Sequence, residues 1–209
     1  ARFLWTLMQT HVLSLCEIDG GNPRNAIPRA AHAVFGVHAS NKEQVRVAFN
    51  NYVADVEGEY SDIEPGLELE LESVDRPDFA VDSNTTRRLI EALYSAPHGV
   101  VSMSRALEGL VETSTNLASV KMQPDNQILV TTSQRSSVES RKWDIANQVE
   151  ALFTMAGAKV THGDGYPGWA PNMNSTIMHV ASEAYEELYG VKPAIKAIHA
   201  GLECGLFLE

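Results

Sequence analysis

The chain has 209 residues, of which 44% are hydrophobic and 21% are charged, and its formal net charge at pH 7 is −11. This composition supports one domain with a sizeable core, or two small domains, and argues against disorder of the whole chain. The acidic balance without a basic stripe argues against a nucleic-acid partner. No stretch approaches the roughly 18–20 apolar residues that a membrane helix requires, so we expect a cytoplasmic protein without a membrane partner.

The two ends of the sequence and its two cysteines give two further expectations. The opening ARFLWTLMQT lacks an initiator Met and resembles the inside of an amphipathic helix, and the closing GLECGLFLE breaks off in an apolar run. We therefore expect a fragment of a longer protein. Cys16 and Cys204 are distant in sequence and form no disulfide framework, so both are expected to be reduced thiols.

The first predicted elements are a helix, two strands and a second helix. After the opening helix, HVLSLCEIDGG (residues 11–21) alternates like a strand and ends at a Gly-Gly turn. A second strand is predicted over residues 33–38, and a capped helix over residues 41–60 has apolar positions at helical spacing. LELELESV (residues 67–74) alternates leucine with glutamate, which predicts a half-buried strand.

The same order of elements recurs in the second part of the chain. A hairpin is predicted over residues 113–137, with Pro124-Asp125-Asn126 as its turn. A helix follows over residues 138–157 and is closed by a glycine, and a strand is predicted at the start of residues 158–169. We interpret this recurrence as an internal duplication of pattern.

The duplication defines the predicted domain organisation. The halves cover about residues 1–75 and 100–165, and the segment 76–99 between them carries a linking helix. Residues 166–209 have a helix-strand-helix rhythm of α/β type. We predict an α+β fold in which residues 1–165 form two related strand-strand-helix-strand halves, followed by a short α/β tail.

Two polar residues stand where they could bind a ligand. Asn25 follows the Gly-Gly turn and precedes Pro28, which fixes the backbone, so its amide can donate to a carboxylate or an oxyanion. Arg135 stands where a predicted strand ends and a helix begins, and its guanidinium can grip a carboxylate through two hydrogen bonds there. The alternatives are a simple turn asparagine and a surface arginine.

Other chemistry has weaker support in the residues. His162 and Asp164 have a metal-ligand spacing but lie in a glycine-rich loop, so we expect no metal site in this chain. A dyad of Cys204 and His199 is conceivable, but a buried inert thiol is the alternative that we favour.

Four segments occur in an order and at spacings that resemble a known family. They are GGNPRNAIPRAAHAV, VETSTNLASVKM, GDGYPGWAPNMNSTIMHV and IHAGLECGLF. Together they resemble the aminoacyl-histidine (Xaa-His) dipeptidase branch of the two-zinc metallopeptidase family that includes carnosinases, aminoacylases and carboxypeptidase G. The resemblance covers nearly the whole chain. It implies a catalytic α/β domain with two zinc ions and an inserted, ferredoxin-like lid domain of two related halves, which fits residues 1–165.

The resemblance also implies what this chain lacks. The metal ligands of the family, its catalytic Glu and the His of its lid Gly-Gly-His motif have no matching positions here. We therefore expect two zinc ions, or other divalent metals, only in the full-length enzyme. For this chain by itself we expect no catalytic residue, no metal and no hydrolysis.

Three lid residues carry over from the family as substrate-binding candidates. Asn25 matches the asparagine of the family's Asn-Xaa-Ile-Pro motif, which contacts the substrate near the scissile group. Arg135 lies where the second lid half carries an arginine suited to the C-terminal carboxylate of the substrate. Asn116 is a third and less specific match.

The segment HAGLECG matches the family segment that floors the active cleft. Here a short strand over residues 194–199 would bring His199 to the cleft edge, and Gly201 would let the backbone approach the substrate. Glu203 would orient its neighbours or bind a substrate amine, with helix capping as the alternative.

The combined prediction is the lid of a dipeptidase acting on Xaa-His dipeptides. The lid would bind the substrate carboxylate and close the active site, and exposed sheet edges would pair two chains into a homodimer. The alternative is a non-enzymatic dimerisation or small-molecule-binding regulatory module, because duplicated units of this kind also build such domains.

Overall fold

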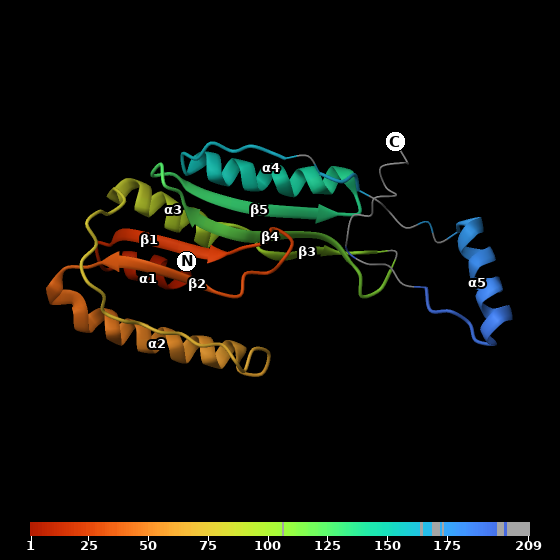
Figure 1. Ribbon diagram of the computed structural model, residues 1–209, viewed down its shortest axis with the longest axis horizontal. Coiled ribbons are helices and arrows are strands. Elements are labelled where there is room, and N and C mark those ends of the chain that lie inside the picture. Colours follow the sequence, from red (N-terminus) through yellow and green to blue (C-terminus); the bar gives the residue numbers. More distant parts are fainter. Residues whose placement is uncertain (106, 164, 169–171, 173, 196–198, 200–209) are drawn as a thin grey trace. The chain divides into compact units, whose positions relative to one another are not determined.

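The structure is a computed structural model that describes residues 1–105, 107–163, 165–168, 172, 174–195 and 199. In chain order its elements are α1 (Arg2–Met8), β1 (Ser14–Gly21), β2 (Ala31–Gly36), the 3-10 turn η1 (Ala39–Asn41), α2 (Lys42–Tyr60), α3 (Ser83–Ser95), β3 (Gly99–Met103), β4 (Val111–Met122), β5 (Ile128–Ser136), α4 (Glu139–Met155) and α5 (Thr176–Tyr189) (Figure 1).

The chain divides into two compact units that share three elements. The first unit contains Ala1–Ala96, Leu117–Thr131 and Ala151–Val160. The second contains Pro97–Asn116, Thr132–Glu150 and Thr161–Glu209. Because β4, β5 and α4 each contribute residues to both units, the division runs across these elements. The predicted boundaries at residues 75, 100 and 165 therefore remain a prediction about the two halves.

One antiparallel sheet carries all five strands, in the order β2-β1-β4-β3 with β5 also paired to β4. β1 pairs with β4 at residues 119–121, whereas β3 pairs with β4 at residues 111–115. At the tip of the β4–β5 hairpin, the backbone N–H of Gln123 donates to the carbonyl of Gln127 at 2.8 Å. The long β4 strand is therefore the element that joins the other strands.

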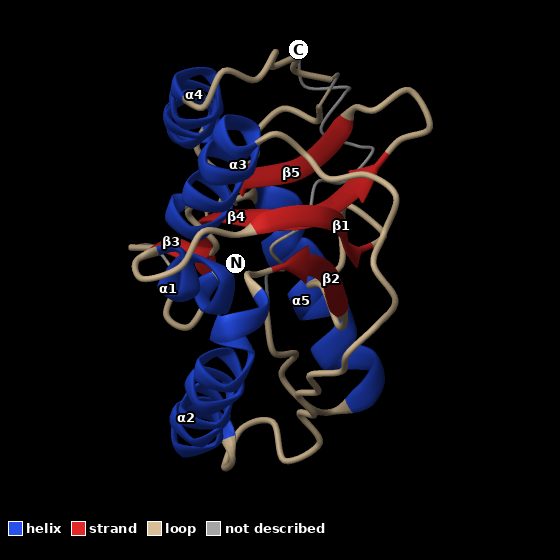
Figure 2. Ribbon diagram, turned by 90° about the vertical axis from the view of Figure 1, so that its left-hand side faces the viewer, coloured by secondary structure: helices blue, strands red, loops and turns tan. Residues whose placement is uncertain are grey.

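The hydrophobic core of the first unit lies between β1 and the helices α1 and α3. Figure 2 shows these two helices on the same side of β1 and β2. The amphipathic pattern of α3 explains this placement, because its apolar face packs inward while its polar face remains in solvent. The buried members of the core are Leu4, Leu7, Leu13, Leu15, Ile18, Val45, Ile90, Leu93 and Val120.

Aromatic contacts and an ion pair attach α2 to the opening helix. The ring of Phe3 packs edge-on against Phe49, with 5.3 Å between the ring centroids. The guanidinium of Arg2 donates to both carboxylate oxygens of Glu59, at 2.6 and 2.8 Å. These contacts hold one side of α2 against α1 and leave its other side exposed.

The α+β class is confirmed, and the first two predicted strands and the predicted hairpin are each followed by the predicted helix. Neither predicted closing strand forms, however. Residues 67–74 are extended but pair with no strand, although Leu71 packs against the core as the alternation suggested. The alternation placed Leu69 and Leu71 correctly on the partly buried side, whereas Leu67 is 48% exposed, and a strand also needs a neighbour that supplies backbone hydrogen bonds.

The strand predicted at the start of residues 158–169 is also absent, for a different physical reason. There the chain turns back along α4, and Nε2 of His162 lies 2.8 Å from the Glu150 carboxylate. Further on, the Lys142 ammonium donates to the carbonyl of Tyr166 at 2.8 Å. Side chains of α4 therefore fix this segment in place of a strand ladder.

The short strand β3 was not expected. The sequence GVVSM is short and lacks the clear alternation that would predict a strand. Most of its side chains are exposed, and it is a strand because β4 supplies its backbone partners. In the part of the chain that the structure describes, no helix has the length and apolar character to cross a membrane.

Candidate functional site

A polar cluster on β4 and β5 brings together residues that are distant in sequence. The hydroxyl of Ser114 on β4 lies 2.7 Å from Nε2 of His199. From β5, Nη1 of Arg135 donates to the backbone carbonyl of His199 at 3.3 Å. We call Ser114, Arg135, His199 and Asn116 the lid cluster.

Alternation along β4 assigns Asn116 to this cluster. Asn116 lies two residues after Ser114, so both side chains project from the same face of the strand. The side-chain oxygen of Asn116 is buried. The intervening Thr115 points to the other face, where its hydroxyl accepts a hydrogen bond from the Gln134 amide at 3.1 Å.

The electrostatics of the cluster keep His199 neutral. Burial lowers the pKa of the His199 imidazole, and the positive charge of Arg135 lowers it further. A hydrogen bond between the ring and the backbone of Val111 opposes these two effects in part. Near neutral pH the cluster therefore combines one fixed cation with neutral hydroxyl, imidazole and amide groups. Such a combination suits a carboxylate ligand.

The substrate-binding residues predicted from the sequence fall into three groups. Arg135 and His199 are in direct contact, and Asn116 lies on the same face of β4 as the residue that touches His199. Asn25 is exposed in the loop between β1 and β2 and belongs to the other unit. Gly201 and Glu203 lie outside the described residues, as do residues 196–198 of the strand predicted over residues 194–199.

The sequence prediction missed Ser114. The signal that would have identified it is its spacing of two residues from Asn116 within VETSTNLASVKM, which places both on one face of a strand. A serine in a strand attracts little attention by itself, and only its contact with His199 singles it out.

Zinc, which the family resemblance implies, does not fit the side chains that the structure describes. Among those residues, no group of three or more His, Cys, Asp or Glu lies close enough to hold a metal ion. His162, which the sequence made a weak metal candidate, contacts Glu150 and packs edge-on against the Trp143 ring. We therefore derive no catalytic step through a metal from these residues.

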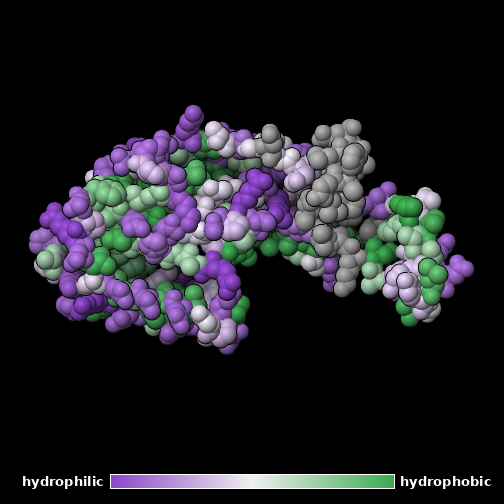
Figure 3. Space-filling view, viewed as in Figure 1, coloured by the Kyte–Doolittle hydropathy of each residue, from purple (hydrophilic) through white to green (hydrophobic). Residues whose placement is uncertain are grey.

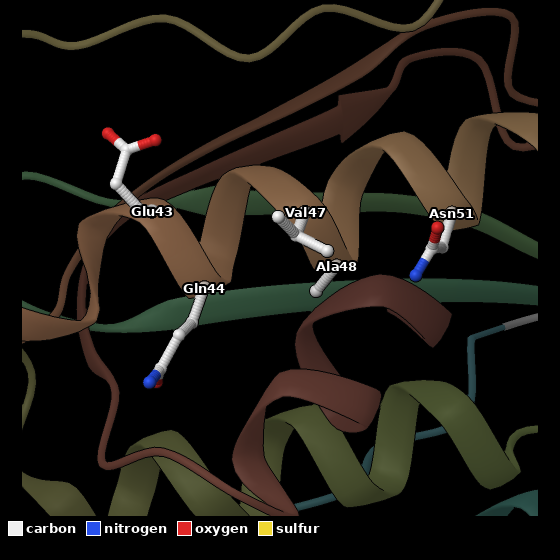
Figure 4. A pocket seen from close by; sticks show the side chains of 5 residues that line it. All are labelled: Glu43, Gln44, Val47, Ala48 and Asn51. Atoms are coloured by element: carbon white, nitrogen blue, oxygen red, sulfur yellow. The ribbon is translucent and has the colours of Figure 1, made fainter.

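A second surface feature lies on the outer side of α2. There Glu43, Gln44, Val47, Ala48 and Asn51 line a shallow hollow (Figure 4). Val47 points outward with 59% of its surface exposed, although a valine in a helix of a globular protein is usually covered. This side of α2 therefore presents one exposed apolar side chain among mainly polar ones.

Comparison with known proteins gives these features a family context. Residues 1–64 match the family model described as "Peptidase dimerisation domain". Over 206 residues, 99% of the chain, the sequence is 37% identical to the cytosol non-specific dipeptidase of Escherichia coli (strain K12). The fold matches the crystal structure of aminoacylhistidine dipeptidase from Vibrio alginolyticus with a TM-score of 0.91 and 36% identity over 99% of this chain.

The chain resembles a segment of the aminoacyl-histidine dipeptidases. It spans 42% of the length of each of these two relatives. The resemblance that four sequence motifs indicated is therefore confirmed by overall sequence identity and by fold. The hollow on α2 lies within residues 1–64, the part that matches the dimerisation domain. The lid cluster lies outside that part.

Proposed function

We propose that this chain is the lid and dimerisation segment of a metallo-dipeptidase that hydrolyses Xaa-His dipeptides. The observation that carries the proposal is the fold, because 99% of the chain superimposes on the Vibrio aminoacylhistidine dipeptidase with a TM-score of 0.91. The Escherichia coli relative is named a cytosol non-specific dipeptidase, which supports peptide-bond hydrolysis and a cytoplasmic location for this protein too.

In this proposal the lid cluster binds the C-terminal carboxylate of the dipeptide. The guanidinium of Arg135 uses one N–H on the carbonyl of His199 and has further N–H donors for a carboxylate. Asn116 and His199 border the same site. Asn25 belongs to the other unit, and its contact with the substrate near the scissile bond is proposed from the family motif alone. When the lid closes, these groups orient the dipeptide and exclude water.

The metal chemistry belongs to the whole enzyme in this proposal. Two zinc ions, or other divalent metals, would be held by residues outside this chain and would supply the Lewis acidity that peptide hydrolysis requires. For the 209-residue chain by itself we propose no hydrolytic activity.

Dimerisation is the second part of the proposed function. The match of residues 1–64 to a dimerisation domain supports a homodimer formed through this part of the chain. β2 stands at one end of the strand order, and a strand at a sheet edge presents backbone groups that a second copy can pair with. The exposed side of α2 adds apolar contact area beside the strand pairing.

Hydrolysis assays on the full-length protein test the enzymatic part. Dipeptides of the Xaa-His type are compared with the same dipeptides bearing a C-terminal amide. Arg135→Gln should lower kcat/KM for the free carboxylate by roughly 10- to 100-fold, the value of a charge-assisted hydrogen bond. The same variant should leave hydrolysis of the amide nearly unchanged, because the amide lacks the charge that Arg135 binds.

A matched control is Arg87→Gln, which removes an exposed arginine on α3. It should behave like the wild type with both substrates. Equal effects of Arg135→Gln on acid and amide would contradict the assignment of Arg135. A full-length protein that self-associates but hydrolyses no dipeptide with any divalent metal would favour the alternative, a non-enzymatic dimerisation module.

A further inference from the structure

Ser114 and Arg135 hold one residue, His199, by two different groups. Ser114 engages the imidazole at Nε2, at 2.7 Å, and Arg135 engages the backbone carbonyl, at 3.3 Å. These partners lie 85 and 64 residues from His199 along the chain, so tertiary structure alone creates the contacts. His199 is thus fixed at both its ring and its backbone by two paired strands.

The contact at Nε2 links Ser114 to the tautomer of His199. In a neutral imidazole one ring nitrogen carries the proton and the other accepts a hydrogen bond. The Ser114 hydroxyl lies 2.7 Å from Nε2, and a hydroxyl can take either role. The role that Ser114 takes at Nε2 therefore determines which ring nitrogen of His199 carries the proton.

We propose that Ser114 is a positioning residue of the lid cluster: its hydroxyl forms a hydrogen bond with Nε2 of His199 and holds the neutral ring in one orientation and one tautomer beside Arg135. A charged imidazolium in this place would repel the guanidinium and compete with it for a substrate carboxylate. A fixed neutral ring keeps His199 in contact with Ser114 and leaves Arg135 to bind the carboxylate. This inference rests on the proposed function of the cluster.

Nitrogen NMR of the full-length protein, labelled selectively in its histidine rings, reports the tautomer directly. Loss of one signal pair in His199→Gln assigns the His199 resonances. In the wild type, the two ring nitrogens should show the widely separated shifts of a single fixed tautomer. Ser114→Ala should bring these shifts toward each other as the tautomers mix, and Ser114→Thr should restore the separation because it retains the hydroxyl.

Dipeptide kinetics on the same variants provide an independent readout. Ser114→Ala should raise KM for an Xaa-His dipeptide by about two- to tenfold, the value of one neutral hydrogen bond, with kcat changed less than KM. Ser114→Thr should return KM to the wild-type range. Thr132→Val removes the hydroxyl of a half-buried threonine on the opposite face of β5 and should alter neither KM nor the His199 shifts.

The outcomes separate this inference from the proposed function. Unchanged His199 shifts in Ser114→Ala, or the same change in Thr132→Val, would overturn the role of Ser114. An unchanged KM in a variant whose ring shifts have moved would overturn it as well. If the wild type hydrolyses no dipeptide, the proposed function fails, while the ring shifts still decide whether Ser114 positions His199. Should the alanine variant not fold, Ser114→Cys tests the same contact with a weaker donor.

Discussion

At the scale of single residues, Gly21 occupies a position that has no room for a side chain. Its backbone has φ of 66°, in the left-handed region, and a Cβ built at this position would lie 1.9 Å from the carbonyl oxygen of Ala118. Gly21→Ala must therefore separate β1 from β4 or strain the turn, and we expect a loss of about 2–4 kcal/mol in the free energy of unfolding. Urea denaturation measures this loss. Gly36→Ala on β2 is the control, because its Cβ would meet only ordinary contacts at 3.8 Å and beyond. If the two variants lose the same free energy of unfolding, the steric explanation for Gly21 is wrong.

At the scale of elements, the start of α3 depends on Asp82. One carboxylate oxygen of Asp82 accepts hydrogen bonds from the backbone N–H groups of Asn84 and Thr85, each at 3.0 Å. Hydrogen bonds from the Thr85 side chain and backbone are the main cause of a lowered pKa at Asp82. Because the folded pKa is depressed, the charge stabilises the fold above the ordinary aspartate pKa of about 4 and loses this effect as pH falls through the folded value.

Two variants of Asp82 test the contribution of this helix cap to stability. Asp82→Ala should lower the urea midpoint at neutral pH, because the first turn of α3 loses its acceptor. Asp82→Asn should have a urea midpoint at neutral pH close to that of the wild type, because its amide oxygen still accepts the hydrogen bonds. Below about pH 4 its stability should fall less steeply than that of the wild type, because it has no carboxylate to protonate. Equal midpoints for the alanine and asparagine variants at neutral pH would show that the cap contributes nothing.

The packing of β1 against α1 and α3 makes a second prediction at the scale of elements. Leu15 on β1 has 0% of its surface exposed and belongs to the core cluster. Leu15→Ala should cost about 2–5 kcal/mol, through lost burial and the cavity that it leaves. Val12→Ala, at a position 82% exposed just before the strand, should stay within about 0.5 kcal/mol of the wild type. Calorimetry or urea titration of both variants decides whether the core is where the structure places it.

At the scale of the whole molecule, the prediction concerns the surface that forms the proposed homodimer. Val47 on α2 and Val100 on β3 are each 59% exposed, but only Val47 lies within residues 1–64. Val47→Asp should shift the full-length protein from dimer to monomer in sedimentation velocity, because a buried unpaired charge is costly at an interface. Val100→Asp should leave the dimer intact. The proposed surface is wrong if Val47→Asp sediments like the wild type or if both variants dissociate.

A second helix surface is exposed in the part of the chain that the structure describes. α5 buries none of its own residues, and Ile177, Val180 and Leu188 are among its exposed apolar side chains. Figure 3 shows green, hydrophobic atoms on the surface of this helix. Its sequence predicted this helix well, since Ser175 precedes it and Gly190 closes it in the left-handed conformation. Periodicity alone indicates that a face is apolar, but it does not indicate what covers that face.

Local patterns predicted most helices, the first two strands and the hairpin over residues 113–137. Helical spacing over residues 41–60 and 138–157 and the turn at Pro124-Asp125-Asn126 reflect interactions between near neighbours, which a sequence contains in full. The strand predicted over residues 67–74 was wrong and β3 was missed, because whether an extended segment becomes a strand depends on a partner elsewhere in the chain.

The sequence by itself determined the α+β class, the order of most elements and, through four motifs, the resemblance to a dipeptidase family. Only tertiary structure decided that Ser114 and Arg135 meet at His199, and that residues 158–163 follow α4 instead of joining a sheet. The physical reason is range: helix periodicity and turns depend on residues a few positions apart. A polar cluster depends on which strands pair and in what register, which no local pattern encodes.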